Sequence, residues 1–261
     1  MSKKRLALIG CGKLNEIVAD ACESGALPEY ELVGVLGRDP RKAAAFAERH
    51  HCKACASIDE LLAEKPDFTA EAASVQAVRD YAQLVLAGGS NLVVLSIGAF
   101  ADANFYDSVK LIAAGADRQV YIASGAVGGF DVLRTAALMG PVDVSFGSQK
   151  PPAVIAQGPL ATPGVGELDE PKTMFSGTAA EAIQILPTHV NVAVAAALAS
   201  AGPDNMQVEI SAVPGFEGDE YKIELIGEEV KTDLNIYSRT SKVAGWSVVA
   251  ALKNAVAPIV F

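Results

Sequence analysis

The first residues with a spacing suited to chemistry are the glycines of Gly10-Cys11-Gly12-Lys13-Leu14-Asn15, between an apolar run and a helix-like stretch. Gly10 permits a tight turn, and Gly12 has no Cβ, so a pyrophosphate can approach the amides that open the helix. Asn15 stands where the usual G-x-G-x-x-G pattern has its third glycine, which weakens the match. The alternative is an ordinary strand-to-helix turn. The residues predicted to contact a dinucleotide here are Gly10, Gly12, Lys13 and Leu14.

The second apolar segment, residues 31–36, leads into Gly37-Arg38-Asp39. Sites specific for NAD usually have an acidic residue at this strand end, bound to the ribose hydroxyls of the adenosine. Arg38 can instead pair with a 2′-phosphate and stack on adenine. We therefore expect NAD or NADP as cofactor, with NADP slightly favoured. The alternative makes Arg38 a solvated turn residue and Asp39 the cap of the next helix.

Apolar strands and amphipathic helices alternate along the first half of the chain. The expected strands are residues 5–9, 31–36, 68–72, 92–97 and 120–123, and the expected helices are residues 14–24, 40–50, 57–64, 75–87 and 103–115. Short helical crossovers indicate a doubly wound parallel sheet. The sequence therefore predicts an α/β protein in which residues 1–139 form a dinucleotide-binding Rossmann domain.

The pattern changes after about residue 139. The expected strands are residues 143–147, 173–176, 206–213, 221–226 and 229–237, and the expected helices are residues 179–186 and 190–200. Alternation in the later strands indicates antiparallel pairing, and the Pro- and Gly-rich residues 149–171 are expected to form a long loop. Residues 140–239 are thus predicted to be a smaller α+β substrate and dimerisation domain. The apolar C-terminal helix, within residues 240–261, is expected to pack back on the first domain.

Composition narrows the class of partner. The 261 residues carry a formal net charge of −10 without a dense Lys/Arg run, so a nucleic acid or an anionic membrane is not an expected partner. The apolar run before Gly10 is too short for a signal peptide, and no apolar stretch reaches the ~20 residues that span a bilayer. We expect a cytoplasmic protein that acts on a small molecule.

Two cysteines, Cys52 and Cys55, follow His50 and His51 at a spacing used by zinc sites and redox pairs. No second pair of ligands lies at a suitable spacing. The interpretation we favour is that these are free cysteines packed as small apolar side chains, with no metal bound.

Longer motifs give the chain a resemblance to a known family, the L-aspartate dehydrogenases, over nearly its whole length. These motifs are Gly10-x-Gly12, Glu71-Ala72-Ala73-Ser74, Ser96-Ile97-Gly98-Ala99-Phe100-Ala101-Asp102, Ser124-Gly125-Ala126-Val127-Gly128-Gly129-Phe130-Asp131, Lys150-Pro151-Pro152 and Pro187-Thr188-His189-Val190-Asn191-Val192-Ala193. The resemblance implies oxidation of L-aspartate to oxaloacetate and ammonia through iminosuccinate, with hydride transfer to NAD(P)⁺.

The resemblance also places two dinucleotide-contacting positions, at Ala126 and Asn191. Glycines beside Ala126 would let the backbone approach a nicotinamide ring, and an Asn amide can bind its carboxamide or ribose. The alternatives are a structural turn around Ala126 and an Asn191 side chain that bonds backbone groups at a helix start.

One departure from the family concerns catalysis. The family has a histidine within an Asn-x-His pattern at the position that Tyr221 occupies here. Amine oxidation needs a group that moves protons near neutral pH. Tyr221 can act as an acid with a pKa lowered by Lys222 or by the cofactor, or His189 can take over the role. The third alternative is another substrate or no turnover, with Tyr221 a packed strand residue.

A carboxylate substrate requires cations, and Lys150 is the preferred candidate because it lies in a Pro-rich segment after a strand. Gln149 stands where the family often has an arginine, so one arm of a paired clamp is missing. The other candidates are Lys222, Arg239 and the Lys242 that opens the last helix, where capping and solvated charges are the alternative.

The sequence thus predicts an NAD(P)-dependent amino-acid dehydrogenase similar to L-aspartate dehydrogenase. The alternatives are an oxidoreductase or imine reductase that uses a different small carboxylate or amine, and a dinucleotide-binding protein without turnover. A homodimer through the sheet of the second domain is expected by analogy with other two-domain enzymes.

Overall fold

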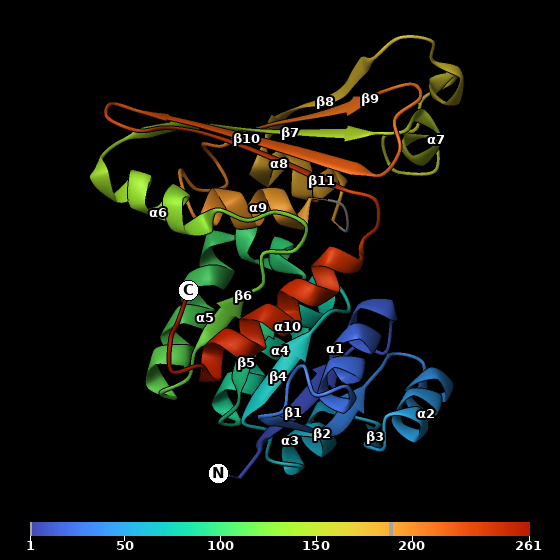
Figure 1. The fold of residues 1–261 in the computed structure, drawn as a ribbon, viewed down its shortest axis with the longest axis vertical. Coiled ribbons are helices and arrows are strands. Elements are labelled where there is room, and N and C mark those ends of the chain that lie inside the picture. Colours follow the sequence, from blue (N-terminus) through green and yellow to red (C-terminus); the bar gives the residue numbers. More distant parts are fainter. Residues whose placement is uncertain (1, 188–189) are drawn as a thin grey trace. The chain divides into compact units, whose positions relative to one another are not determined.

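The computed structural model describes residues 2–187 and 190–261 (Figure 1). It divides into two compact units, residues 1–125 with 242–261 and residues 126–241. This division lies before the boundary expected after Met139, because helix α6 (Phe130–Met139) contacts strand β10 (Asp219–Gly227) of the second unit. Each unit has its own sheet.

The first unit contains a six-stranded parallel sheet with strand order β3-β2-β1-β4-β5-β6. Its strands are β1 (Lys4–Ile9), β2 (Tyr30–Leu36), β3 (Lys53–Cys55), β4 (Phe68–Glu71), β5 (Asn91–Val94) and β6 (Val120–Ile122). The order reverses between β1 and β4, which is where doubly wound sheets bind ligands at their carboxyl edge. The predicted Rossmann sheet is confirmed.

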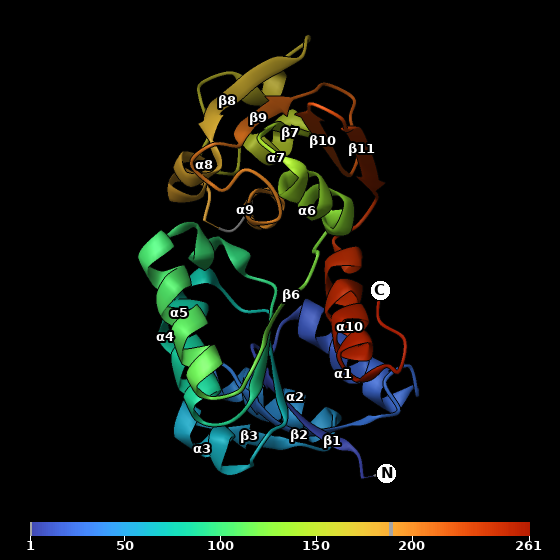
Figure 2. The ribbon, with the colours of Figure 1, turned by 90° about the vertical axis from the view of Figure 1, so that its left-hand side faces the viewer.

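Helices cover both faces of this sheet. They are α1 (Lys13–Glu23), α2 (Pro40–Arg49), α3 (Ile58–Ala63), α4 (Val75–Ala87), the 3-10 helix η1 (Ile97–Ala101), α5 (Ala103–Gly115) and α10 (Lys242–Val256). Figure 2 shows α4 and α5 on one face and α1 and α10 on the other. Side-chain caps begin several of them: Asp39 caps α2, Ser57 caps α3 and Ser74 caps α4.

The C-terminal helix α10 belongs to the core of this unit. Val248 and Leu252 are fully buried in the same cluster as β1, and the Tyr30 hydroxyl donates to the Leu252 carbonyl at 2.7 Å. A Cβ at Gly245 would lie 2.7 Å from Ile17 Cδ1. Glycine therefore allows α10 to approach α1 closely, which explains how a helix distant in sequence completes the layer.

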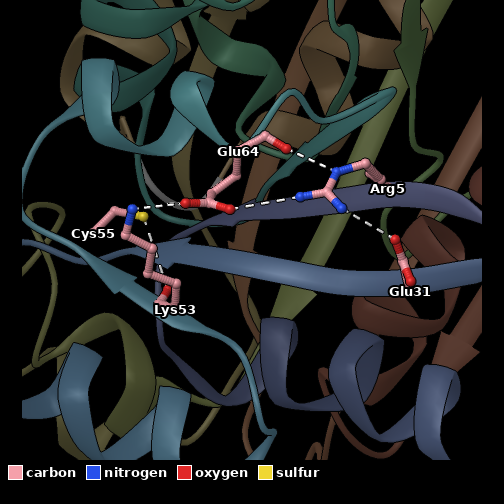
Figure 3. A network of polar contacts seen from close by, with 5 residues as sticks. All are labelled: Arg5, Glu31, Lys53, Cys55 and Glu64. Atoms are coloured by element: carbon pink, nitrogen blue, oxygen red, sulfur yellow. Dashed lines mark hydrogen bonds and ion pairs between the residues drawn. The ribbon is translucent and has the colours of Figure 1, made fainter.

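Charged side chains pair with one another at the amino ends of β1, β2 and β3 (Figure 3). The Arg5 guanidinium lies 3.3 Å from a Glu31 carboxylate oxygen and 3.5 Å from one of Glu64, and Lys53 Nζ lies 2.6 Å from the other Glu64 oxygen. These side chains are partly or largely exposed, so each pair adds little to stability. The positive charges of Arg5 and Lys53 are therefore neutralised locally by Glu31 and Glu64.

The second unit contains a five-stranded sheet with strand order β11-β10-β7-β9-β8. Besides β10, its strands are β7 (Val142–Lys150), β8 (Lys172–Thr178), β9 (Gln207–Ala212) and β11 (Lys231–Ser238). The expected antiparallel pairing holds except between β7 and β9, which run parallel. The long segment between them supplies the crossover that a parallel pair requires.

The helices of the second unit are α6, α7 (Pro152–Ile155), the 3-10 helix η2 (Val165–Glu167), α8 (Ala179–Ile185) and α9 (Asn191–Leu198). The expectation of a loop throughout residues 149–171 is wrong. Gln149 and Lys150 are the last residues of β7, so Lys150 lies in a strand and not in the segment after it, and α7 and η2 interrupt the rest. Helix α7 begins with Pro152, whose fixed φ suits a first helical position. Along β7 the side chains of Val144, Phe146, Ser148 and Lys150 are buried on one face.

No helix within residues 2–187 and 190–261 combines the length and apolarity needed to cross a membrane.

Candidate active site

The turn after β1 has the geometry of a phosphate-binding loop. Gly10 has φ +102°, and a Cβ there would lie 2.9 Å from the Ala72 carbonyl oxygen. Gly12 is the N-cap of α1 without a side-chain cap, and a Cβ at Gly12 would meet nothing within 4 Å. The amides that open α1 therefore face open space with no capping side chain, at the positive end of the helix. This is the arrangement that a pyrophosphate requires.

Asn15 supports this turn from beneath. Its side chain is fully buried, and Nδ2 donates to the carbonyls of Ile9 and Gly10 at 2.9 and 2.8 Å. The usual glycine at this position allows the helix to pack closely on the strand. Asn15 achieves the contact by hydrogen bonds instead. The motif shows only that the third glycine is missing. The supporting role of Asn15 becomes visible from its burial and its two hydrogen bonds.

The end of β2 has a glycine in the region where NAD-specific sites usually have an acidic residue. A Cβ at Gly37 would lie 2.7 Å from Cys11 Sγ and 3.2 Å from the Ala43 Cβ. Arg38 follows with an exposed side chain, and Asp39 caps α2 by accepting from the Arg41 and Lys42 amides at 2.9 and 3.3 Å. The capping role considered for Asp39 is confirmed.

A buried carboxylate lies at the same edge of the sheet. Glu71 ends β4 and is 1% exposed, and it accepts hydrogen bonds from the backbone of Ala73, Ser74 and Ser96. Burial raises its pKa above the usual value, while the hydrogen bonds oppose that rise. The sequence predicts no role for Glu71, although a charged side chain within the expected strand 68–72 was a visible signal.

The turn before Ala126 is tied to the C-terminal helix. The Gly125 amide donates to Ser247 Oγ of α10 at 2.9 Å, and Gly125 has φ +66°. Ala126 itself is half-buried. Three residues later, Gly129 has φ +75°, and a Cβ there would lie 2.6 Å from Leu234 Cδ1. Two of the glycines around Ala126 are thus required by the backbone, and Ser247 is a supporting residue that the sequence does not predict.

Two of the predicted site residues, Lys150 and Tyr221, come together on the buried face of the second sheet, which we call its inner face. Lys150 Nζ lies 2.6 Å from Asp219 Oδ1 and 5.6 Å from the centroid of the Tyr221 ring. Lys150 and Tyr221 are 8% and 6% exposed. The register places Ser148 opposite Tyr221, and Ser148 Oγ is buried with no partner among the described residues. We call Lys150, Asp219, Tyr221 and Ser148 the inner-face cluster.

The electrostatics of Tyr221 differ from the expectation. Burial, with a smaller contribution from the Asp219 charge, raises the pKa of the Tyr221 phenol, so a lowered pKa is wrong for the chain alone. Lys222 is exposed, since successive side chains of a strand point to opposite faces. Tyr221 therefore stays protonated near neutral pH and can donate a proton or a hydrogen bond, but it cannot act as a base.

Lys150 also borders a small hollow within the second unit. Its other lining residues are apolar: Val154, Ile155, Gly158, Pro159, Leu160, Leu186 and Ile210. A cation in largely apolar surroundings attracts a carboxylate strongly because little water competes. The hollow is therefore a small apolar space beside a lysine whose charge Asp219 already pairs at 2.6 Å.

The other predicted site residues lie outside the inner-face cluster. Asn191 is the first residue of α9 and is half-buried. His189 lies outside the described residues. Lys222, Arg239 and Lys242 are exposed.

The four cysteines are free thiols, which includes Cys52 and Cys55, for which the sequence predicted it. Burial raises the pKa of Cys22 and of Cys52 to about 11, which disfavours the reactive thiolate. One group of possible metal ligands occurs among the described residues, formed by Asp20, Glu23 and His50. His50 Nδ1 lies 2.7 Å from Glu23 Oε1, so that nitrogen is engaged as a hydrogen-bond donor to the carboxylate.

Comparisons with known proteins identify the family of the chain. The family model described as "Aspartate dehydrogenase, C-terminal" matches residues 131–255, and the model described as "Homoserine dehydrogenase, NAD binding domain" matches residues 10–123. The chain is 31% identical to the L-aspartate dehydrogenase of Methanococcus maripaludis over 98% of both chains. It is 33% identical to L-aspartate dehydrogenase 1 of Bordetella pertussis over 86% of this chain and 83% of that one.

A solved structure supports the fold. The crystal structure of aspartate dehydrogenase from Thermotoga maritima matches with a TM-score of 0.81 at 22% identity, over 99% of each chain. Both units of the chain therefore have counterparts in one known architecture. From its sequence relatives over nearly its full length, the chain belongs to the L-aspartate dehydrogenase family, a family of NAD(P)-dependent oxidoreductases.

Proposed function

We propose that this protein is an L-aspartate dehydrogenase, which converts L-aspartate, NAD(P)⁺ and water into oxaloacetate, ammonia, NAD(P)H and a proton. The observation that carries the proposal is the open helix start at Gly12, at the reversal point of a parallel sheet, in a chain that matches such enzymes over 98% of its length. The first unit holds the cofactor, and the second provides the substrate site and the dimer interface.

The residues at the carboxyl edge of the first sheet fit a dinucleotide. Gly10, Gly12, Lys13 and Leu14 would hold its pyrophosphate through backbone amides, since a Cβ at Gly12 would point into open space. Ala126 and Asn191 would hold its nicotinamide half. A bound nicotinamide cofactor would supply the acceptor for the hydride of the substrate Cα. The protein's contribution is to hold the two reactants together in a fixed orientation.

The inner-face cluster would bind the substrate and move protons. Lys150 binds a substrate carboxylate beside the apolar hollow, with Asp219 as its resting partner. The protonated Tyr221 donates a proton to the departing amine when water has added to the imine. A separate group must remove the proton from the substrate ammonium, and His189 is the candidate for that base.

Arg38 is proposed to favour NADP. Because Gly37 carries no acidic side chain that would repel a 2′-phosphate, the exposed Arg38 guanidinium can pair with that phosphate. The expected result is a lower Kd for NADPH than for NADH. An equal or lower Kd for NADH would contradict this part of the proposal.

The test is a steady-state assay of NAD(P)H formation from L-aspartate, with Lys150→Met and Lys222→Met as a matched pair. Both variants remove one lysine charge from the same sheet, but Lys222 is exposed on the opposite face. Lys150→Met is expected to lower kcat/KM for aspartate about 100-fold, the value of one charge-assisted contact to a carboxylate. Lys222→Met should keep kcat/KM close to that of the unmodified protein, and because Lys222 lies on the face proposed for the dimer, sedimentation must show that this variant has the same mass as the unmodified protein. A similar loss in both variants would contradict the assignment of Lys150.

A second candidate function follows from Asp219. Because Asp219 already matches the charge of Lys150 at 2.6 Å, a dianionic substrate must compete with it, whereas a less charged one need not. An NAD(P)-dependent oxidoreductase or imine reductase that uses a different small carboxylate or amine is therefore the alternative. A screen of amino and keto acids with ammonia, followed by NAD(P)H absorbance, separates the two. Aspartate as the preferred substrate would exclude the alternative.

A homodimer is proposed through the exposed face of the second sheet. Exposed side chains alternate along β7 and β11 on that face, which includes Asp143, Ser145 and Tyr237. Sedimentation of the purified protein is expected to give twice the chain mass of 27.0 kDa.

A further inference from the structure

One buried charge at the cofactor edge has no place in the mechanism above. Glu71 is the last residue of β4, and the register pairs it with Ile9 of β1, directly before Gly10. The reversal point of the strand order lies between these two strands. A dinucleotide bound at the reversal point passes over this position. Burial of a carboxylate is costly, so four hydrogen bonds at this position indicate a specific task.

Those four hydrogen bonds come from two different turns. Glu71 Oε1 accepts from the Ala73 and Ser74 amides at 2.7 and 2.9 Å and from Ser96 Oγ at 2.9 Å. Oε2 accepts from the Ser96 amide at 3.0 Å. No ion pair to Glu71 occurs among the described residues, so backbone and hydroxyl donors alone compensate its charge.

Both turns form walls of the carboxyl edge. Residues 72–74 join β4 to α4, with Ser74 capping that helix, and Ser96 precedes η1 after β5. The first turn also contacts the phosphate loop: a Cβ at Gly10 would lie 2.9 Å from the Ala72 oxygen and 3.0 Å from the Ala73 Cβ. Movement of the Glu71 carboxylate would therefore move the surface against which Gly10 packs.

We propose that Glu71 is a positioning residue for the dinucleotide, which fixes the turns after β4 and β5 against the Gly10 loop so that the cofactor meets a preformed edge. This inference rests on the proposed cofactor site and adds the residue that shapes it. It acts through the turns, so no contact between the carboxylate and the cofactor is required. Preformed sites bind more tightly because ordering is not required on binding.

The alternative is that Glu71 contributes only to folding, and a residue two positions earlier distinguishes the two roles. Thr69 is also in β4 and fully buried, and its hydroxyl bonds Ser90 at 2.9 Å, away from the carboxyl edge. Loss of a buried polar contact at Thr69 should lower stability without changing the cofactor edge. Thr69→Val is therefore the matched control for Glu71→Gln.

Glu71→Gln keeps the shape of the side chain, but its NH₂ group faces one of the donors that now reach the carboxylate. We measure Kd for NADPH and NADH by nicotinamide fluorescence and Tm for each variant. Glu71→Gln is expected to raise both Kd values about ten-fold. Thr69→Val is expected to lower Tm about as much as Glu71→Gln does, but to change either Kd less than about two-fold. Unchanged Kd values in a folded Glu71→Gln protein would overturn the inference, as would equal losses of affinity in both variants.

If Glu71→Gln does not fold, Ser96→Ala tests whether the Glu71 contacts shape the cofactor edge. It removes the Ser96 hydroxyl bond and keeps the backbone bonds. The expected result is a rise in Kd of about three-fold, and an unchanged Kd would overturn the inference. Failure of the unmodified protein to bind either nucleotide would instead contradict the proposed function itself, so the two failures are distinguishable.

Discussion

The two candidate sites of this chain are built from different materials. At the carboxyl edge of the first sheet, backbone amides and glycines form the binding surface, as at Gly10 and Gly12. On the inner face of the second sheet, the side chains of Lys150, Asp219 and Tyr221 form it. A backbone surface tolerates sequence change as long as its glycines remain. A side-chain surface changes its chemistry with a single residue.

Each site departs from the family pattern in a way that illustrates this difference. Asn15 stands where the usual motif has a glycine, and its amide holds the turn by two hydrogen bonds to the carbonyls of Ile9 and Gly10. Tyr221 stands where the resemblance to the family leads us to expect a histidine, and its raised pKa keeps it protonated near neutral pH. The first departure therefore keeps the turn in place through other bonds, whereas the second changes the acid–base chemistry that the side chain can supply.

The largest expected effect is at Gly10. Gly10→Ala introduces a side chain at φ +102° and 2.9 Å from the Ala72 oxygen, so the turn must shift. We expect the Kd for NADPH to rise about 1,000-fold, about 4 kcal/mol, measured by fluorescence titration. Gly25→Ala is the control, because Gly25 also has positive φ, at +80°, with nothing within 4 Å of its Cβ. An equal loss of affinity in both variants would mean that backbone strain, rather than the cofactor edge, is responsible.

The next effect tests the side-chain site. Tyr221→Phe removes the phenol proton and should lower kcat for aspartate oxidation about 100-fold, typical of a lost general acid, with no change in cofactor Kd. Phe146, whose ring lies 5.7 Å from that of Tyr221, still packs on the variant. A fall in kcat below about three-fold would remove Tyr221 from proton transfer.

The pH profile of the same step has a definite sign. The pKa of Tyr221 is raised above its ordinary value, so the donor form persists throughout the range below that value. The Tyr221-dependent step should therefore not slow between pH 7 and about pH 10, and any loss should begin only above that range. A decline that begins near pH 8 in the unmodified protein, and disappears in Tyr221→Phe, would contradict the burial argument.

Arg38 gives a smaller effect on the cofactor side. Arg38→Ala is expected to raise the Kd for NADPH about ten-fold and to leave the Kd for NADH within about two-fold, because only NADPH carries the 2′-phosphate. Arg49→Ala is the control, since it removes the same charge at the other end of α2, where Arg49 pairs with Glu16 at 2.6 Å. A parallel change for both nucleotides would exclude recognition of the phosphate.

The smallest effect is expected at Asn15. Asn15→Gly restores the common motif and removes the hydrogen bonds to Ile9 and Gly10. The Kd for NADPH should change less than about three-fold, while the free energy of unfolding falls by about 1–3 kcal/mol as two buried carbonyls lose their donor. Denaturant titration and fluorescence measure the two quantities. A ten-fold rise in Kd would mean that Asn15 contributes to binding directly.

The first unit could be predicted closely from the sequence because its signals are local. Alternating strands and helices, and caps such as Asp39 and Ser57, require only neighbouring residues. The parallel pairing of β7 with β9 could not be predicted, because strand direction depends on the path of a long connection. Helix α7 could not be predicted either, because it is too short to show a periodic pattern.

The same difference between local signals and long-range contacts applies to the two candidate sites. The contacts at Gly10 follow from a motif, whereas the pairing of Lys150 with Asp219 joins residues 69 positions apart. No spacing rule predicts such a contact. Glu71 was visible as a charged side chain within the expected strand 68–72, but its partners on two separate turns depend on the sheet order.

The most direct test of the account is fluorescence titration of the unmodified protein with NADPH and NADH. The account predicts saturable binding of a reduced nicotinamide nucleotide, which is weakened by Gly10→Ala and unaffected by Gly25→Ala. The absence of any binding by the folded protein would contradict it.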